Sequence, residues 1–232
     1  MIYVTSDLHG YPLKKFQKLL SDAGFGDEDY LFILGDVIDR GEEGVEILKW
    51  LLVQPNVQLI LGNHEAMMLE CDFLLKEITD QSLVEFTNYR WGVLRTWRAN
   101  GGDSTLSALR KEPQEVKESI FEYLRDCPLY DTVSVGDKNY LLVHGGLGDF
   151  SEDKKLSEYI PHDFLWARPY FDEEYSKKFI TILGHTPTGF YGAQFNGKIL
   201  HRPTWINVDV GCARGLPPAL LRLDDMAEFY GD

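Results

Sequence analysis

Residues 32–44, FILGDVIDRGEEG, hold the change of pattern on which the fold depends. An apolar run stops at Gly35, and Asp36, Asp39 and Arg40 follow directly. Taken alone, a Gly-Asp pair after an apolar run is more often a turn than a functional site. The same ending occurs in four other segments, SDLHG, LGNHE, VHGG and LGHT, so five unrelated turns explain the pattern poorly.

The residues around this stretch alternate between strand and helix patterns. Apolar, β-rich runs at 2–5, 30–34 and 57–61 predict three strands. Between them, apolar residues recur at helical spacing over 13–20 and 45–52. Strands that alternate with helices over short connections predict a parallel sheet covered by helices.

The middle of the chain, at about residues 66–127, has helical spacing and no strand signal. We interpret it as a helical insertion in which Asn100-Gly101-Gly102 forms a tight turn. The last third is rich in strand patterns and begins with a hairpin that turns at Gly136. Repeats and low-complexity linkers are absent from the sequence, which predicts a single domain over residues 1–232.

Composition narrows the class of protein. The chain of 232 residues is 44% hydrophobic, which suits a packed core, and its net charge of −14 has no basic block to offset it. Nucleic-acid and anionic-membrane partners are therefore disfavoured, although bound metal ions would still allow an anionic substrate. The three cysteines are widely spaced, and the sequence contains no signal-peptide pattern and no apolar run long enough to span a bilayer. We expect a reduced, cytoplasmic protein whose oligomeric state the sequence leaves open.

The residues at the strand ends are oxygen and imidazole donors, which suit divalent cations such as Mn²⁺, Fe²⁺ or Zn²⁺. Polar residues at the carboxyl ends of strands in an open α/β sheet lie where ligands bind. Six donors exceed the needs of one tetrahedral centre, and they predict two ions about 3.5–4 Å apart that share a carboxylate. A lone histidine is more often a structural residue, but the set of segments favours a metal site. The candidate ligands are Asp7, His9, Asp36, Asn63, His144 and His185.

In this order the segments resemble those of the calcineurin-like metallophosphoesterases, and within them the compact bacterial and phage phosphoprotein phosphatases. That family has GDxHG, GDxVDRG, GNHE, HGG and GHTP, where this chain has SDLHG, GDVIDRG, GNHE, HGG and GHTP. The departures at Ser6 and Ile38 remove no candidate ligand. The likeness continues through WRANGG, LWARP and NVDVGCARG. It implies a four-layer α/β/β/α fold, with two mixed β-sheets flanked by helices.

The resemblance also implies roles for the candidate residues. His64 would protonate the leaving group, with Asp39 as its hydrogen-bond partner that keeps it cationic; the alternative for Asp39 is a solvent-facing loop carboxylate. Arg40 and Arg168 would bind the phosphoryl oxygens, although Arg168 could also be an ordinary surface arginine. A hydroxide held between the metals would attack phosphorus directly. The implied first-metal ligands are Asp7 and His9, the bridging ligand is Asp36, and the second-metal ligands are Asn63, His144 and His185.

The function expected from this resemblance is that of a metal-dependent phosphatase with two divalent ions, Mn²⁺ before Fe or Zn. A serine/threonine protein phosphatase, with phosphotyrosine as a further substrate, is the preferred interpretation. A symmetrical dinucleoside-tetraphosphate hydrolase is the alternative, because it shares the fold and most motifs. An inactive scaffold protein would have lost His64, Asp39 or a ligand, and all are present. The expected partner is a phosphorylated protein or a small phosphoester.

Overall fold

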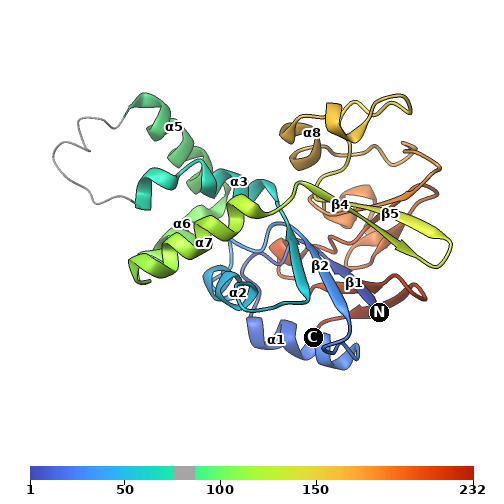
Figure 1. Ribbon diagram of the computed structural model, residues 1–232, viewed down its shortest axis with the longest axis horizontal. Helices are drawn as coiled ribbons and strands as arrows, with labels where there is room; N and C mark the ends of the chain where they lie inside the picture. Colours follow the sequence, from blue (N-terminus) through green and yellow to red (C-terminus); the bar gives the residue numbers. More distant parts are fainter. Residues whose placement is uncertain (76–86) are drawn as a thin grey trace.

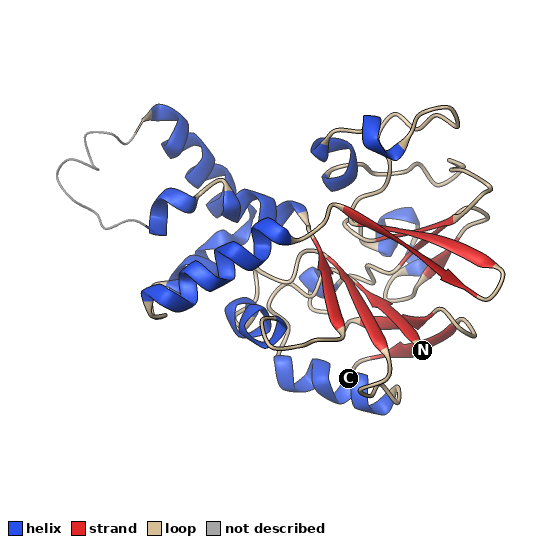
Figure 2. Cartoon of the chain, viewed as in Figure 1, coloured by secondary structure: helices blue, strands red, loops and turns tan. Residues whose placement is uncertain are grey.

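The computed structural model describes residues 1–75 and 87–232, so part of the predicted insertion, residues 76–86, lies outside the described residues. Two five-stranded sheets pack face to face, with helices on their outer sides (Figures 1 and 2). Each sheet contains both parallel and antiparallel neighbours. The predicted α/β fold with two mixed sheets is therefore confirmed.

The first sheet has the strand order β10-β9-β1-β2-β3. β1, β2 and β3 are parallel, as predicted, and β9 pairs antiparallel with β1. α1 and α2 connect the parallel strands and lie on the outer face of this sheet (Figure 1). The bounds are β1 Ile2–Thr5, α1 Leu13–Asp22, β2 Tyr30–Leu34, α2 Gly44–Leu51, β3 Val57–Ile60, β9 Ala219–Arg222 and β10 Ala227–Tyr230.

The second sheet has the strand order β4-β5-β6-β8-β7. The predicted hairpin is confirmed, because β4 pairs antiparallel with β5 across Gly136. β5, β6 and β8 are parallel, so their carboxyl ends meet at one edge. The bounds are β4 Tyr130–Val135, β5 Lys138–Val143, α8 Pro161–Leu165, β6 Ile180–Leu183, β7 Leu200–His201 and β8 Trp205–Asn207, with short helices η3 Leu156–Glu158, η4 Thr188–Tyr191, η5 Ala193–Phe195 and η6 Cys212–Arg214.

The described residues between β3 and β4 form helices that project to one side of the sheets (Figure 1). At the predicted turn, Asn100-Gly101-Gly102, the chain kinks between α5 and α6, because Gly101 has a non-helical φ of 106°. The residues Arg98–Gly102, labelled η2, span this kink. Gly101 there brings its carbonyl to the backbone N–H of Arg40, at 3.0 Å. The bounds are α3 Asn63–Leu69, η1 Asp72–Leu75, α5 Asn88–Trp97, α6 Asp103–Leu109 and α7 Gln114–Asp126.

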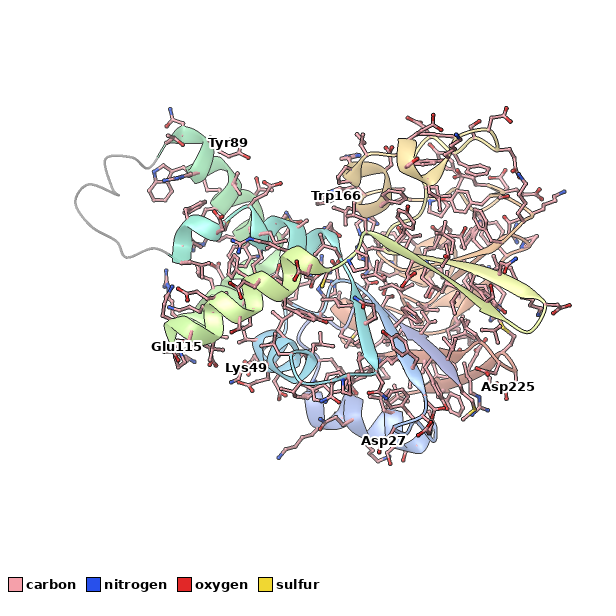
Figure 3. The ribbon with its side chains drawn as sticks, viewed as in Figure 1. Asp27, Lys49, Tyr89, Glu115, Trp166 and Asp225 are labelled. Carbon is pink, nitrogen blue, oxygen red and sulfur yellow. The ribbon has the colours of Figure 1, made fainter. Side chains whose placement is uncertain are left out.

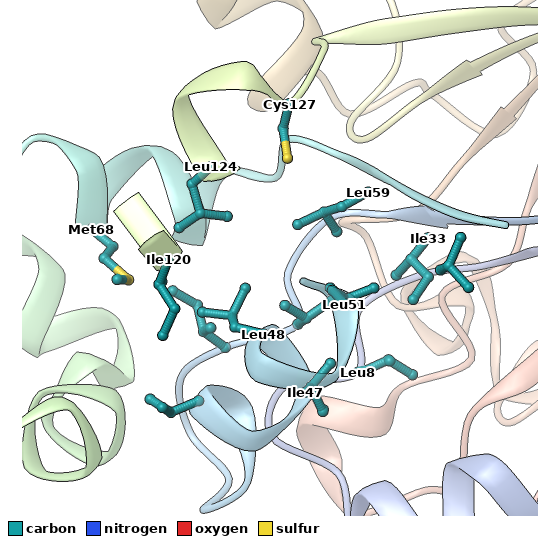
Figure 4. Packing of buried hydrophobic residues seen from close by; sticks show 14 of the residues in the cluster. Leu8, Ile33, Ile47, Leu48, Leu51, Leu59, Met68, Ile120, Leu124 and Cys127 are labelled. Carbon is teal, nitrogen blue, oxygen red and sulfur yellow. The ribbon is translucent and has the colours of Figure 1, made fainter. Parts of the chain in front are cut away.

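An apolar cluster joins these helices to the first sheet (Figure 4). Leu48 of α2, Ile33 of β2, and Ile120 and Leu124 of α7 are all buried in it. Burial of one such side chain contributes about 1.5–3 kcal/mol, so this packing holds the helical part against the sheet. A second cluster fills the space between the two sheets. Within residues 1–75 and 87–232, none of the helices is long and apolar enough to cross a membrane.

Candidate metal centre and active site

The candidate ligands lie where several strands end, and the backbone is strained at four of the six. Asp7 follows β1 with φ 52°, Asp36 follows β2 with φ 55°, and His185 follows β6 with φ 66°. A non-glycine residue seldom adopts a positive φ, and this conformation costs of order 1–3 kcal/mol. His9 and Asp39 share this conformation. Such strain persists only where packing fixes it. Of these residues, Asp7, His9, Asp36 and His185 line one cavity.

A first group of donors surrounds the Nε2 atom of His9. That nitrogen lies 3.6 Å from Oδ2 of Asp36 and 3.9 Å from Oδ1 of Asp7. The Nδ1 atom of His9 lies 3.0 Å from the carbonyl oxygen of Ile38 and donates its proton there. Nε2 of the neutral imidazole therefore presents a lone pair toward two carboxylates.

A second group surrounds the Nε2 atom of His144. Oδ1 of Asp36 lies 3.5 Å away, Oδ1 of Asn63 2.9 Å and Nδ1 of His185 3.2 Å. The other ring nitrogen of His144 donates to the carbonyl oxygen of Leu34 at 2.7 Å. Four lone-pair atoms thus converge on one point, an arrangement that a cation would stabilise. Asp36 presents one oxygen to each group.

The charge states of the buried side chains also favour bound cations. Burial raises the pKa values of Asp7, Asp36 and Glu65, and neighbouring carboxylates raise that of Asp36 further. Burial lowers the pKa values of His9 and His185. Carboxylates and neutral imidazoles withdrawn from water are the donors that divalent ions require, so the residues present fit a dinuclear centre.

Glu65 supports the loop after β2 and is not one of the facing donors. Its carboxylate accepts the backbone N–H groups of Asp36 at 2.8 Å, Val37 at 2.9 Å and Gly62 at 3.1 Å. These bonds tie the end of β2 to the start of α3. Asp36 is therefore held relative to Asn63 and His64, the first two residues of α3.

His64 and Asp39 form the predicted pair. Nδ1 of His64 lies 2.6 Å from Oδ2 of Asp39, whose side chain is fully buried. The solvent-facing alternative for Asp39 is therefore wrong. Burial and the nearby Arg40 lower the pKa of His64 to about 3, whereas burial raises the pKa of Asp39 to about 6. Withdrawal of both groups from water thus favours the neutral imidazole in the substrate-free protein, whereas the resemblance implied a cationic one.

Arg40 and Arg168 line the same cavity as the donors. The guanidinium of Arg40 donates to Nε2 of His9 at 2.9 Å and to Nε2 of His64 at 3.1 Å. A cation on His9 would displace it from that nitrogen. Nη1 of Arg168 donates to the His185 carbonyl oxygen at 3.2 Å and to Oγ1 of Thr186 at 2.8 Å. Arg168 is exposed, and these bonds hold its guanidinium at the cavity.

Comparison with known proteins identifies the family that has this arrangement of residues. The family model for calcineurin-like phosphoesterases matches residues 1–210. The chain belongs to this family. Serine/threonine-protein phosphatase 2 of Salmonella typhimurium is 31% identical over 72% of this chain and 67% of its own length. Symmetrical bis(5'-nucleosyl)-tetraphosphatase of Buchnera aphidicola is 39% identical over 29% of this chain and 25% of its own length.

The solved structures support the fold of this phosphoesterase. A protein assumed to be a diadenosine tetraphosphatase gives a TM-score of 0.66 at 16% identity, covering 99% of this chain and 91% of that one. The predicted class of enzyme, a hydrolase of phosphoester bonds, is confirmed by the family. The relatives named above differ in substrate, and only part of the second is matched, so the family leaves the substrate open.

Three residues of the phosphoesterase site escaped the sequence analysis. Asp209 is 2% exposed and lines the cavity with the donors. The run INVDVG carries the same signal as the other strand ends, an apolar run that stops at an aspartate, but it was not recognised. Trp97 donates from Nε1 to Oδ2 of Asp39 at 2.9 Å, and Oγ1 of Thr105 donates to Oδ1 of Asp39 at 2.6 Å. Both belong to the helical part of the chain: Trp97 is the first residue of the motif WRANGG, and Thr105 follows that motif.

Asp209 gives a pH prediction for the metal-free phosphoesterase. Burial raises the pKa of Asp209 well above 3.8, so the folded state holds this proton more tightly than the unfolded state. Stability from this group is therefore present below pH 3.8 and is lost as pH rises through the folded pKa. We expect the stability of Asp209→Asn relative to the natural protein to grow with pH. Urea unfolding of both chelator-treated proteins at about pH 4, 6 and 8 measures the difference; a constant difference would contradict it.

Proposed function

We propose that this phosphoesterase is a dinuclear, Mn²⁺-dependent phosphatase of phosphoserine and phosphothreonine in proteins, acting in the cytoplasm, with phosphotyrosine as a further substrate. The observation that carries the proposal is Asp36, whose two carboxylate oxygens face two separate donor groups. His64 lies next to it, with its backbone N–H donated to Oδ1 of Asp36 at 3.0 Å. A clamp for two ions beside an acid–base pair suits in-line hydrolysis of a phosphate ester.

The extent of the likeness supports a protein substrate. The protein phosphatase of Salmonella matches 72% of this chain, whereas the tetraphosphatase of Buchnera matches 29%. The second candidate function nevertheless has its own support, because a tetraphosphatase of Actinobacillus succinogenes is 28% identical over 62% of the chain. The segments GNHE and DRG resemble those of the protein phosphatases more than those of the tetraphosphatases.

The ligand assignment that we propose follows the two donor groups. Asp7 and His9 would hold the first ion, Asn63, His144 and His185 the second, and Asp36 both. When bound, the ions would lower the pKa of water and neutralise charge on the phosphoryl oxygens. Manganese is proposed because the donors are carboxylate, amide and imidazole groups, with no thiolate.

The chain's own residues would then orient the substrate and move a proton. Arg40 and Arg168 present guanidinium groups at the cavity, where their fork geometry matches two phosphoryl oxygens. His64 directs Nδ1 to Asp39, which leaves Nε2 facing the cavity side. A phosphoryl dianion near Nε2 would raise the pKa of the imidazole, so the proton for the leaving alkoxide would be taken up with the substrate.

A paired assay tests this proposal. Protein stripped with a chelator and refilled with Mn²⁺ would be given a phosphoserine or phosphothreonine peptide, or diadenosine tetraphosphate, under the same conditions. Peptide turnover that depends on Mn²⁺ and exceeds nucleotide cleavage is the expected result. Efficient cleavage of the tetraphosphate with little peptide turnover would overturn the substrate class and favour the second candidate. Refilling with Fe²⁺ or Zn²⁺ tests the choice of metal.

Thr105 yields a further prediction, because it holds the partner of His64 from the helical part of the chain. Its hydroxyl donates to Oδ1 of Asp39 at 2.6 Å and accepts the backbone N–H of Asp39 at 2.9 Å. Thr105→Val should lower turnover of an alkyl phosphate about 10-fold, the loss of one hydrogen bond to a charged group. Thr105→Ser keeps the hydroxyl and should retain most of that turnover.

Two substrates with different leaving groups distinguish this positioning role from a simple loss of stability. Thr105→Val also leaves a buried carboxylate oxygen without a donor, which lowers the free energy of unfolding by about 1–3 kcal/mol. Turnover of p-nitrophenyl phosphate, whose leaving group needs little protonation, should fall much less than that of the alkyl phosphate. An equal loss on both substrates would refute positioning of Asp39 by Thr105.

A further inference from the structure

A second and larger cavity adjoins the donor cavity. It has a volume of about 490 Å³ and shares Arg40, Arg168 and His185 with the donor cavity. Phe190 of η4 and Arg214 of η6 line this second cavity and do not line the first. A group bound at Phe190 and Arg214 would therefore lie beyond the phosphoryl position, toward the remainder of the substrate.

Arg214 is held at this cavity by an aromatic ring. Its guanidinium carbon lies 4.2 Å from the centroid of the Phe190 ring. The short helix that carries it runs between Gly211 and Gly215, whose φ values of 105° and 85° turn the chain at both ends. Among residues 1–75 and 87–232 the guanidinium has no ion pair and no side-chain hydrogen bond. Stacking leaves the five N–H donors of an arginine available to a ligand.

The second cavity is lined by positive charge, although the whole protein is acidic. The chain carries 37 acidic and 23 basic side chains, yet three guanidinium groups line this one cavity. In the proposed function, Arg40 and Arg168 bind the scissile phosphoryl group. Arg214 then remains for a second anion.

We propose that Phe190 and Arg214 form a subsite for an acidic side chain of the phosphoprotein, a glutamate or aspartate near the phosphorylated residue. This inference rests on the proposed function, since it assumes a peptide at the site. The guanidinium covers one face of the Phe190 ring, and that face is closed to a nucleobase. The fork of an arginine matches the two oxygens of a carboxylate, so the side chain of an acidic residue is the ligand of choice.

The test compares peptides that differ by one charge. A phosphoserine peptide flanked by alanines is compared with peptides in which glutamate replaces each flanking alanine in turn, using Mn²⁺-loaded protein. In the natural protein, kcat/KM should rise about 2- to 5-fold for glutamate at one or two positions, as for an ion pair with an exposed arginine. Arg214→Gln should abolish the ratio between glutamate and alanine peptides, and Arg214→Glu should invert it.

Arg202 provides a matched control variant. Its guanidinium carbon lies 4.0 Å from the centroid of the Phe171 ring, and it does not line the cavity. Arg202→Gln makes the same change of charge and of stacking, and should leave the glutamate-to-alanine ratio unchanged. A loss of the ratio in this variant would show a general effect of charge and overturn the subsite.

The other outcomes of the peptide assay show whether the subsite at Arg214 or the proposed phosphatase function is wrong. Peptide turnover with no glutamate preference in the natural protein overturns the subsite and leaves the proposed function standing. A loss confined to diadenosine tetraphosphate in Arg214→Gln assigns the guanidinium to a polyphosphate and overturns the peptide subsite. Absence of turnover on every phosphopeptide overturns the proposed function, together with the subsite that rests on it.

Discussion

Asp36→Asn is expected to lower metal-dependent turnover about 100-fold or more, the largest loss that we predict for one substitution. Oδ2 of Asp36 lies 3.6 Å from Nε2 of His9, and Oδ1 lies 3.5 Å from Nε2 of His144. Asparagine keeps the shape and one oxygen, which can still accept the backbone N–H of His64. It loses the negative charge and the second oxygen, so it cannot serve both donor groups as a carboxylate does.

The direct measurement is metal content. Asp36→Asn protein, loaded with Mn²⁺ and then dialysed, should retain at most one ion per chain by mass spectrometry. Asp39→Asn is the matched control, because Asp39 is equally buried and bonds to His64, Trp97 and Thr105. That variant should keep both ions while losing activity. Two fully bound ions in Asp36→Asn would refute the assignment of Asp36 to both groups.

Stability provides an independent readout of the same substitution. Burial and the neighbouring carboxylates Asp7 and Glu65 raise the pKa of Asp36 well above 3.8, so its charged form destabilises the metal-free fold. Near neutral pH, metal-free Asp36→Asn should therefore unfold at a higher urea concentration than the metal-free natural protein. Added Mn²⁺ should reverse this order, because only the natural protein gains the full binding free energy of two ions.

Local patterns in the sequence predicted the strands and the residues at their ends. The change from an apolar run to a polar residue at Asp36 occurs within consecutive residues, so it can be recognised in the sequence. Parallel strands bring their carboxyl ends to one edge of the sheet. Contacts between distant residues lacked this signal. Thr105 is 66 residues from Asp39 in the sequence, and nothing in a helical pattern says which side chain it will contact. Tertiary packing, not local preference, decides such pairs.

The contact that the kink at Arg98–Gly102 makes has the same explanation. A Gly-Gly pair predicts freedom for a positive φ, and Gly101 does adopt one. Position 101 also needs a glycine because Arg40 lies close to it: a Cβ atom added to Gly101 would lie 2.7 Å from the Cγ atom of Arg40. Close approach of Gly101 to Arg40, a residue distant in the sequence, is the constraint there, and it is visible only in the folded protein.

His64→Ala is expected to lower turnover of an alkyl phosphate about 10²–10⁴-fold, the range for loss of a positioned general acid. His64 is the imidazole that contacts Asp39, at 2.6 Å, and it also approaches Arg40 at the cavity. The metal content should be unchanged, because the proposed ligands Asn63 and Asp36 stay in place. Turnover of p-nitrophenyl phosphate should fall far less, since nitrophenolate leaves without a proton.

The contrast between the two substrates distinguishes an acid from a ligand. Nε2 of His64 lies 3.8 Å from Oδ2 of Asp36, so His64 is itself close enough to the first donor group to serve as a metal ligand. Loss of a ligand would reduce the bound metal and slow both substrates alike, whereas loss of an acid slows only the poor leaving group. Unchanged turnover of the alkyl phosphate in His64→Ala would exclude the acid. Loss of one ion from that variant would make His64 a ligand, and a proton donor would then have to be sought elsewhere in the cavity.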